Sequence, residues 1–128
     1  MSKKDARKSF AQPHWEEWIR AAHFSPALRV GRTLYLSGHT GVPDADIETQ
    51  IRQAYEDVAG TLRLAGASWA DVVSITSYHV GFNEQREALR RVHNEFVREP
   101  YPAWSAVGVA ELVDGLAIEI SVIAELPE

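Results

Sequence analysis

The pattern that most constrains this chain is a long amphipathic helix predicted over residues 47–65. Pro43, Asp44 and Asp46 supply start signals before it, and Gly66 ends it. Its apolar residues recur every three or four positions and so share one face of the helix: Ile47, Ile51, Ala54, Tyr55, Val58, Leu62 and Ala65. Such a stripe is stable only when another layer of structure covers it.

A second amphipathic helix and five strand-like runs complete the pattern. Asn83 is expected to cap the second helix, which ends at Phe96 or Val97. Runs of β-branched and aromatic residues predict a hairpin within residues 23–37 and strands at 72–80, 103–109 and 117–126. Strict alternation along the 72–80 strand puts Val73 and Ile75 on the same side. The element order β-β-α-β-α-β-β indicates an α+β fold, a mixed sheet with two helices on one face.

The first 23 residues differ from the remainder. Residues 1–13 are polar and are expected to be irregular, and residues 14–22 can form a short helix with Trp15 and Trp18 on one side. Two indoles on so short a helix need cover, so we expect the helix to dock onto this subunit or a neighbour. The chain is therefore divided into a tail with a short helix, residues 1–23, and a single domain, residues 24–128.

Composition narrows the class of function. The 128-residue chain is 45% hydrophobic, as globular domains are, and its net charge of −5 without a basic stripe disfavours a nucleic-acid partner. It has no cysteine, and its five histidines form no i, i+4 pair, so we expect no disulfide and no metal site. Because no phosphate-cradling motif, signal peptide or membrane span is recognisable, we expect no cofactor, no membrane partner and a cytoplasmic location.

Residues 99–109 join the second helix to the next strand and contain two prolines, Pro100 and Pro102, which exclude helix. Trp104 follows among small residues, which suggests that something approaches the backbone closely. This segment is either one wall of a small-molecule cleft or a loop anchored by a core tryptophan. The sheet face without helices is expected to carry large side chains that another copy would bury: Tyr35, Tyr78, Trp104 and Ile123.

Two charged residues stand out as candidates for chemistry. Glu119 is the acidic group inside a strongly predicted strand, and it is an edge charge, the partner of an arginine, or a catalytic acid or base. Arg90, near the inner edge of the second helix, is either solvated or an anchor for an anion. Ser37 precedes Gly38 and a histidine, but no nucleophile elbow surrounds it.

An ordered set of short segments resembles the reactive intermediate deaminase (Rid, or YjgF) family over residues 24–126. The segments are FSPA (24–27), LYLSG (34–38), AGASWADVV (65–73), PAWSAV (102–107) and IEI (118–120). The resemblance implies a chorismate-mutase-like fold and a homotrimer whose sheets form a central barrel with three clefts between subunits. It also implies hydrolysis of small imines or enamines, such as 2-aminoacrylate, to a keto acid and ammonia.

The resemblance carries site residues over position by position. The family's substrate-binding arginine, in a P-A-R-S segment, falls on Trp104, and its water-positioning glutamate, in an I-E-I-E segment, falls on Ser121. The remaining cleft positions correspond to Phe24 for a tyrosine, Arg90 for a helix asparagine, Ala106 for a cysteine, and Ser37 with Gly38 for the cleft wall.

These departures change the expected activity. Tryptophan cannot pair with a carboxylate, so we expect a small substrate other than 2-aminoacrylate, with Arg90 as a relocated cation and Glu119 as a relocated catalytic base. The alternative is a non-catalytic small-molecule-binding or accessory protein, because both family groups are missing. Ribonuclease activity or inhibition of translation is disfavoured by the acidic balance.

Overall fold

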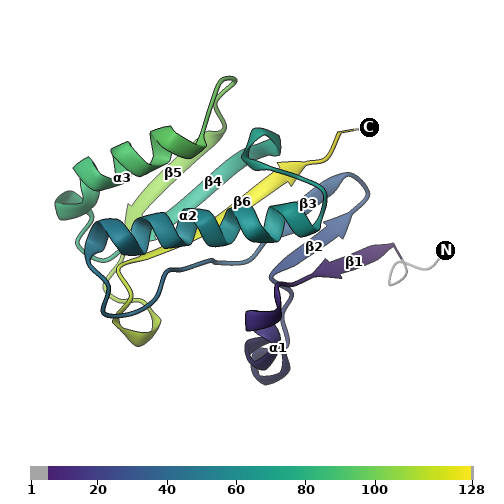
Figure 1. The fold of residues 1–128 in the computed structure, drawn as a ribbon, viewed down its shortest axis with the longest axis horizontal. Coiled ribbons are helices and arrows are strands. Elements are labelled where there is room, and N and C mark those ends of the chain that lie inside the picture. The colour runs from purple at the N-terminus through teal and green to yellow at the C-terminus, as the bar shows by residue number, and fades with distance from the viewer. Residues whose placement is uncertain (1–5, 128) are drawn as a thin grey trace.

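A computed structural model describes residues 6–127 of the chain, and over that range the strands form one six-stranded sheet (Figure 1). The strands are β1 (Arg7–Phe10), β2 (Ala27–Val30), β3 (Thr33–Leu36), β4 (Val72–His79), β5 (Ala103–Gly108) and β6 (Ile118–Glu125). The helices are α1 (Glu16–Ala22), α2 (Ile47–Leu64) and α3 (Phe82–Phe96), with 3₁₀ turns at Pro13–Trp15, Trp69–Asp71 and Val113–Gly115.

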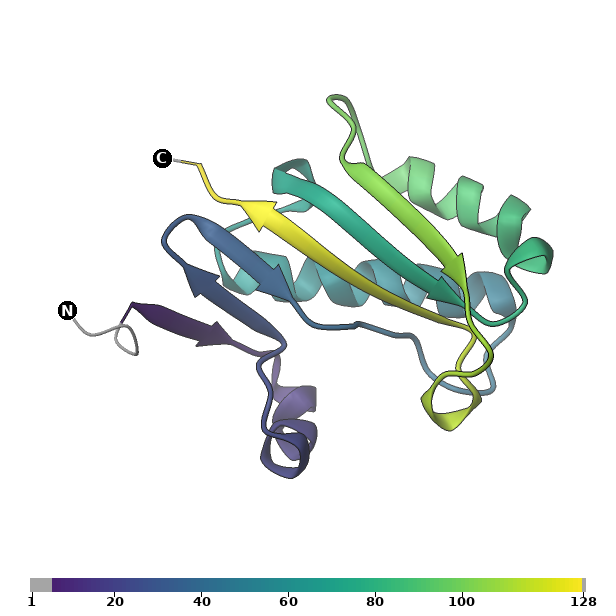
Figure 2. The ribbon, with the colours of Figure 1, turned by 180° about the vertical axis from the view of Figure 1, so that it is seen from behind.

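The sheet order is β1-β2-β3-β6-β4-β5. The neighbours β4 and β5 are parallel, because α3 carries the chain back between them, and the other pairs are antiparallel. Helices α2 and α3 cover one face, and Figure 2 shows the strands in front of them from the opposite side. The predicted α+β fold, a mixed sheet with two helices on one face, is confirmed.

The core lies between α2 and the middle of the sheet. The apolar stripe of α2 is buried there apart from Ile47, which is 39% exposed, and Ile51, Tyr55 and Val58 are fully enclosed. Strand β6 meets it with alternate residues, so that Ile118, Ile120, Val122 and Ala124 face inward as the alternation predicts. The start of α2 is fixed by Asp46, whose carboxylate accepts a hydrogen bond from the Thr49 N–H at 2.8 Å.

The predicted cap of α3 is wrong. Helix α3 begins at Phe82, and its N-cap is Gly81, which has φ +76°. The chain leaves β4 through this left-handed turn, which glycine adopts without steric cost, so Asn83 already lies in the first helical turn.

Strand β4 departs from strict alternation at its beginning. The register against β6 shifts between Val72 and Ser74, which marks a β-bulge. Val73 is 47% exposed whereas Ile75 is 1% exposed, so the expectation that both face one side is wrong. The extra residue turns Val73 to the surface and resets the alternation, which then buries Ile75, Ser77 and His79.

The N-terminal segment is more ordered than its polar composition suggests. Arg7–Phe10 form β1, which pairs antiparallel with β2 from Arg7 opposite Val30 to Phe10 opposite Ala27. The expectation of an irregular segment is therefore wrong for these residues, because the backbone of the β2 edge supplies partners that composition does not reveal. Residues 1–5 of that segment lie outside the described residues. Within residues 6–127, no helix has the length and hydrophobicity needed to span a bilayer.

The bulge in β4 can be tested with two substitutions two residues apart. Ile75→Ala is expected to lower the free energy of unfolding by about 2–5 kcal/mol because it removes a fully buried side chain. Val73→Ala is expected to cost about 1 kcal/mol or less, as surface substitutions do. Urea unfolding followed by circular dichroism measures both values, and equal losses would show that the two side chains share one environment.

Candidate functional site

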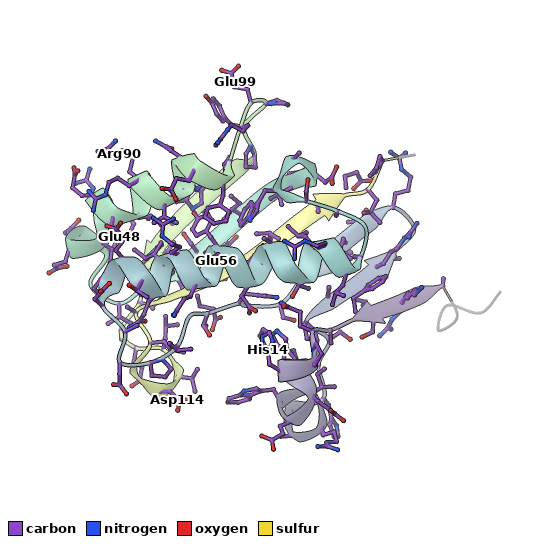
Figure 3. The ribbon with its side chains drawn as sticks, viewed as in Figure 1. His14, Glu48, Glu56, Arg90, Glu99 and Asp114 are labelled. Carbon is purple, nitrogen blue, oxygen red and sulfur yellow. The ribbon has the colours of Figure 1, made fainter. Side chains whose placement is uncertain are left out.

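A pocket of about 660 Å³ opens where α1, the segment after β3 and the loop before β6 meet the side of α2. Four residues expected at a ligand site line it: Phe24, Ser37, Gly38 and Glu119. The remaining walls come from His14, Trp15, Trp18, Thr40, Gly41, Val42, Pro43, Gln53, Asp57, Val113, Asp114 and Leu116. In Figure 3, His14 and Asp114 lie below α2, with His14 on the α1 side and Asp114 in the loop before β6.

Glu119 packs against the backbone of Gly38 in this pocket. An isolated antiparallel β-bridge between His39 and Ile120 holds the segment after β3 beside β6, with backbone hydrogen bonds of 2.7 and 2.9 Å. A Cβ on Gly38 would lie 2.4 Å from Glu119 Oε2, a distance that side chains do not tolerate. Only glycine therefore lets the carboxylate occupy this position.

The environment of Glu119 favours proton transfer. It stands on the sheet face opposite α2, in register with Tyr78, and its side chain is half-buried. Among residues 6–127 its carboxylate has no hydrogen-bond or ion-pair partner, and burial raises the pKa of Glu119. A carboxyl group with a raised pKa beside a pocket can accept and return a proton nearer to neutral pH.

Aromatic rings form part of the pocket wall. The ring centroids of Trp15 and Phe24 are 5.8 Å apart in an edge-to-face arrangement, and Trp15 lies 4.9 Å from His39. Trp18 is 52% exposed. The indole Nε1 of Trp15 is buried without a hydrogen-bond partner, and it is the one such side-chain atom within the described residues. Unsatisfied buried donors are rare in folded proteins, so this one calls for a structural or functional explanation.

Hydrogen bonds hold the N-terminal wall against α2. Gln12 donates to Asp57 Oδ1 and to Thr61 Oγ1, both at 3.0 Å, and His14 Nε2 lies 3.0 Å from Asp57 Oδ1. His39 is fully buried beneath this wall. Its Nδ1–H donates to the Ser37 carbonyl at 2.7 Å, and Nε2 accepts from Thr61 at 2.8 Å.

His39 is a residue that sequence reasoning missed, because a single histidine between two glycines carries no distinctive signal. Burial lowers the pKa of His39, which agrees with the neutral imidazole that its two hydrogen bonds require. It fixes the direction in which Ser37 and Gly38 pass the Glu119 carboxylate.

Trp104 lies on the other side of the sheet. It stands opposite Ile75 in the β4–β5 register, so its side chain faces the helices, and the expectation that it shares a face with Tyr35, Tyr78 and Ile123 is wrong. The side-chain direction follows from the pairing with Ile75, which the bulge in β4 determines.

The indole of Trp104 is held by two contacts. Its ring stacks on His93 of α3 with centroids 4.0 Å apart, and its N–H donates to Ser77 Oγ at 3.0 Å. Ser77 in turn donates to His79 Nε2 at 2.8 Å, and His79 Nδ1–H donates to Gln85 Oε1 at 2.9 Å. This chain satisfies the buried polar groups and leaves Trp104 38% exposed, as a fixed wall at the β5 edge.

The remaining predicted site residues do not join the pocket. Arg90 is exposed on α3, bonded to Glu87 of the same helix at 3.1 Å, and it lies across α2 from His14 in Figure 3. Ala106 stands opposite Ser77 on the helix side, and Ser121 shares the open face with Glu119. A single chain therefore brings Phe24, Ser37, Gly38 and Glu119 together but keeps Arg90, Trp104, Ala106 and Ser121 apart from them. Within the described residues, no group of three or more His, Asp or Glu side chains is placed to hold a metal ion.

Comparison with known proteins gives one family over most of the chain. Residues 16–126 match the family described as Endoribonuclease L-PSP. The chain is 40% identical over 111 residues to the RutC family protein YjgH of Escherichia coli K12, covering 82% of this chain and 84% of that protein. It is 35% identical over 104 residues to a 2-iminobutanoate/2-iminopropanoate deaminase of Dermatophagoides farinae, covering 76% and 80%.

Solved structures agree with the fold. A structure described as Protein YJGH superposes with a TM-score of 0.84 at 34% identity, covering 96% of this chain and 98% of that one. The structure of Rv2704 from Mycobacterium tuberculosis, a member of the YjgF/YER057c/UK114 family, gives a TM-score of 0.85 at 31% identity, covering 94% and 99%.

The contact between Gly38 and Glu119 predicts the effect of adding one methyl group. Gly38→Ala is expected to push the Glu119 carboxylate out of its half-buried position, since the side chain moves more easily than the backbone bridge. The pKa of Glu119 should then fall toward its ordinary value, because solvent returns to the carboxylate. Carboxyl ¹³C NMR titration, with Glu119→Gln to assign the signal, measures this shift. An unchanged pKa would mean that Gly38 does not set the carboxylate's environment.

Proposed function

Because the chain belongs to the Endoribonuclease L-PSP family, which includes the YjgF and RutC proteins, we propose that it is an imine or enamine deaminase. The reaction is hydrolysis of a C=N bond in a small substrate other than 2-aminoacrylate, giving a carbonyl compound and ammonia. The observation that carries this proposal is the unpaired, half-buried Glu119 carboxylate against Gly38 in a pocket of about 660 Å³.

Glu119 serves as the base and then as the acid. As a water oxygen attacks the imine carbon, the Glu119 carboxylate takes a proton from the water. The protonated Glu119 then gives this proton to the nitrogen, which yields a carbinolamine. Glu119 next takes the hydroxyl proton of the carbinolamine and passes it to the nitrogen, so that the C=O bond forms, the C–N bond breaks and ammonia leaves. A raised pKa suits both steps, because the carboxyl group must release the proton as readily as it accepts it.

The residues present support a substrate that is not held by its carboxylate. The relative from Dermatophagoides farinae is named for imines of keto acids. In this chain Trp104 occupies the position at which the resemblance expects the substrate-binding arginine, and its N–H is already bonded to Ser77. Arg90 is bonded to Glu87, so it supplies no relocated cation to this pocket within one chain.

We further propose that the complete cleft forms between copies of a homotrimer. On the open face of the sheet, Tyr35 and Ile123 are exposed and lie opposite each other in register, as apolar surfaces at interfaces do. Trp104 and Ala106 at the β5 edge are separate from the Glu119 pocket in one chain, and a neighbouring copy would supply the opposite wall.

The second candidate is a non-catalytic small-molecule binder. Trp104 is fixed by Ser77 and His93 rather than free to engage a substrate, and Ser121 carries no carboxylate, which favours this alternative. Ribonuclease action ranks below both, because the lining residues of the pocket, all within the described range, include no Lys or Arg to hold a phosphate backbone.

Glu119→Gln is expected to lower ammonia release from imines by about 10²-fold or more, since general acid–base catalysis contributes about 10²–10⁴-fold. The control is Glu125→Gln, an exposed carboxylate on the same strand. Substrates are a panel of imines with and without a carboxylate, generated in situ by amino-acid and amine oxidases. If the protein turned over none of these imines while an active deaminase of the family did, the non-catalytic binder would be the remaining candidate.

The pH dependence separates catalysis from folding. Wild-type activity should rise as the pH increases through the raised pKa of Glu119, because the base acts in its ionised form. Three other titratable residues line the same pocket, His14, Asp57 and Asp114, and they are unchanged in the Glu119→Gln variant. A raised folded-state pKa means that ionising Glu119 costs stability at higher pH. Glu119→Gln should therefore be at least as stable as the wild type at pH 8, and a large loss of stability would assign Glu119 a structural role.

The assembly is tested by light scattering after size exclusion. The wild type should have three times the 14.3 kDa mass of one chain at micromolar concentration. Ile123→Lys, on the open face of the sheet, should shift the mass toward one chain because a buried charge without a partner is costly. Leu64→Lys, an exposed apolar residue at the end of α2, is the matched control and should stay assembled. A wild-type monomer would contradict the homotrimer.

A further inference from the structure

We infer that the pocket selects a cationic imine without a carboxylate, an iminium carried on an aromatic or similarly bulky apolar group. The inference rests on the proposed deaminase function and names the class of substrate for the same site. Three features carry it: the sign of the charge in the lining, the aromatic wall and the volume.

The charged side chains that line the pocket are all acidic, and one histidine is also among the lining residues. Its lining residues, all within residues 6–127, include the carboxylates of Asp57, Asp114 and Glu119 and no Lys or Arg. Asp57 is already bonded to Gln12 and His14. The carboxylates of Asp114 and Glu119 have no such partner in the described part of the chain.

This charge pattern discriminates between ligands by the sign of their charge. A ligand carboxylate would enter with no cation to pair with and with two carboxylates nearby, whereas an iminium would find the partner that they lack. Asp114 is exposed, so solvent screens its charge, whereas the half-buried Glu119 interacts with a nearby charge several times more strongly than in bulk water. The pocket therefore favours cationic over anionic ligands, whereas an arginine at the site would favour anions.

The aromatic wall suits the other end of such a ligand. Trp15, Trp18 and Phe24 line the pocket, and Trp18 leaves half of its surface uncovered. An apolar ring would bury this surface, and a cation over an indole gains a further about 0.5–2 kcal/mol. A three-carbon imine would leave most of a 660 Å³ pocket filled with water, whereas pockets of about 300–1,000 Å³ enclose larger ligands.

The reaction with such a substrate balances without a further reagent. In R–CH=NH₂⁺ + H₂O → R–CHO + NH₄⁺, the water oxygen forms the new bond to carbon and the C–N bond breaks. Glu119 takes one proton from the water and returns it to the nitrogen. It then takes the hydroxyl proton as the C=O bond forms and passes it to the departing ammonia, which leaves as ammonium. The positive charge leaves on ammonium, so the organic product is neutral and loses its attraction to Asp114 and Glu119.

The test measures binding, because iminium ions decay in water. The probes share one phenyl group and differ in charge: 2-phenylethylammonium, 2-phenylethanol and 3-phenylpropionate, with ethylammonium as the cation without a ring. Isothermal titration at one pH and ionic strength gives each Kd. We expect 2-phenylethylammonium to bind at least tenfold more tightly than any other probe.

Matched variants locate the effect. Asp114→Asn should reduce the preference for the ammonium over the alcohol, while Glu119 retains the remainder, and Asp44→Asn should leave it unchanged. Both aspartates have positive φ (55° and 72°), a conformation that asparagine tolerates, but Asp44 does not line the pocket. Trp18→Ala should weaken all three phenyl probes, whereas Tyr101→Ala, an exposed aromatic residue outside the pocket, should not.

The outcomes separate this inference from the proposed function. Equal or tighter binding of 3-phenylpropionate, or no binding of the ammonium, would overturn the ligand class even if the protein hydrolyses carboxylate-bearing imines. Tight, Asp114-dependent binding of the ammonium would support it, and if ammonia were released from no imine, the same result would assign the pocket to a binder of cations.

Discussion

The structure depends on the alternation along β6. Four of its side chains, at Ile118, Ile120, Val122 and Ala124, are buried beneath α2, and burial of these groups supplies much of the stability that holds helix and sheet together. A strand that buries every second residue must turn the residues between to the opposite face. Glu119 is therefore held on the open face of the sheet by the packing of its two neighbours, and it cannot move inward without removing an isoleucine from the core.

That constraint determines what the other elements do for the site. The segment after β3 bonds to the backbone of Ile120 through His39, so that Gly38 passes directly over the Glu119 side chain. The buried imidazole of His39 also links this segment to Thr61 on α2. Gln12 and His14 bring Trp15 and α1, which carries Trp18, to the same side of α2. The carboxylate is thus fixed by the core, and the walls around it are fixed by a few polar contacts at the edge of the core.

The two faces of the sheet also separate the two sets of candidate residues. Glu119 and Ser121 share the open face, whereas Trp104 and Ala106 share the helix side with Ser77, within a chain of hydrogen bonds that runs to Gln85. In one copy, Trp104 and Ala106 do not line the pocket that contains Glu119. A cleft that uses both sets needs a second copy, which is the physical reason that the proposed deaminase function and the proposed homotrimer support each other.

The sequence by itself determined the elements and the layering, because both follow from local periodicity: the stripe of α2, the alternation of β6 and the order of helices and strands. It also singled out Glu119, since an acidic residue in an apolar strand is conspicuous. It could not give the strand β1, the cap of α3 or the exposure of Val73, because these depend on a partner edge, a left-handed glycine and a bulge. Nor could it place Trp104 and Arg90 relative to the pocket. Only the tertiary structure decided those positions, because the face on which a side chain lies is set by the register of its strand against a neighbour, and a one-residue shift reverses it.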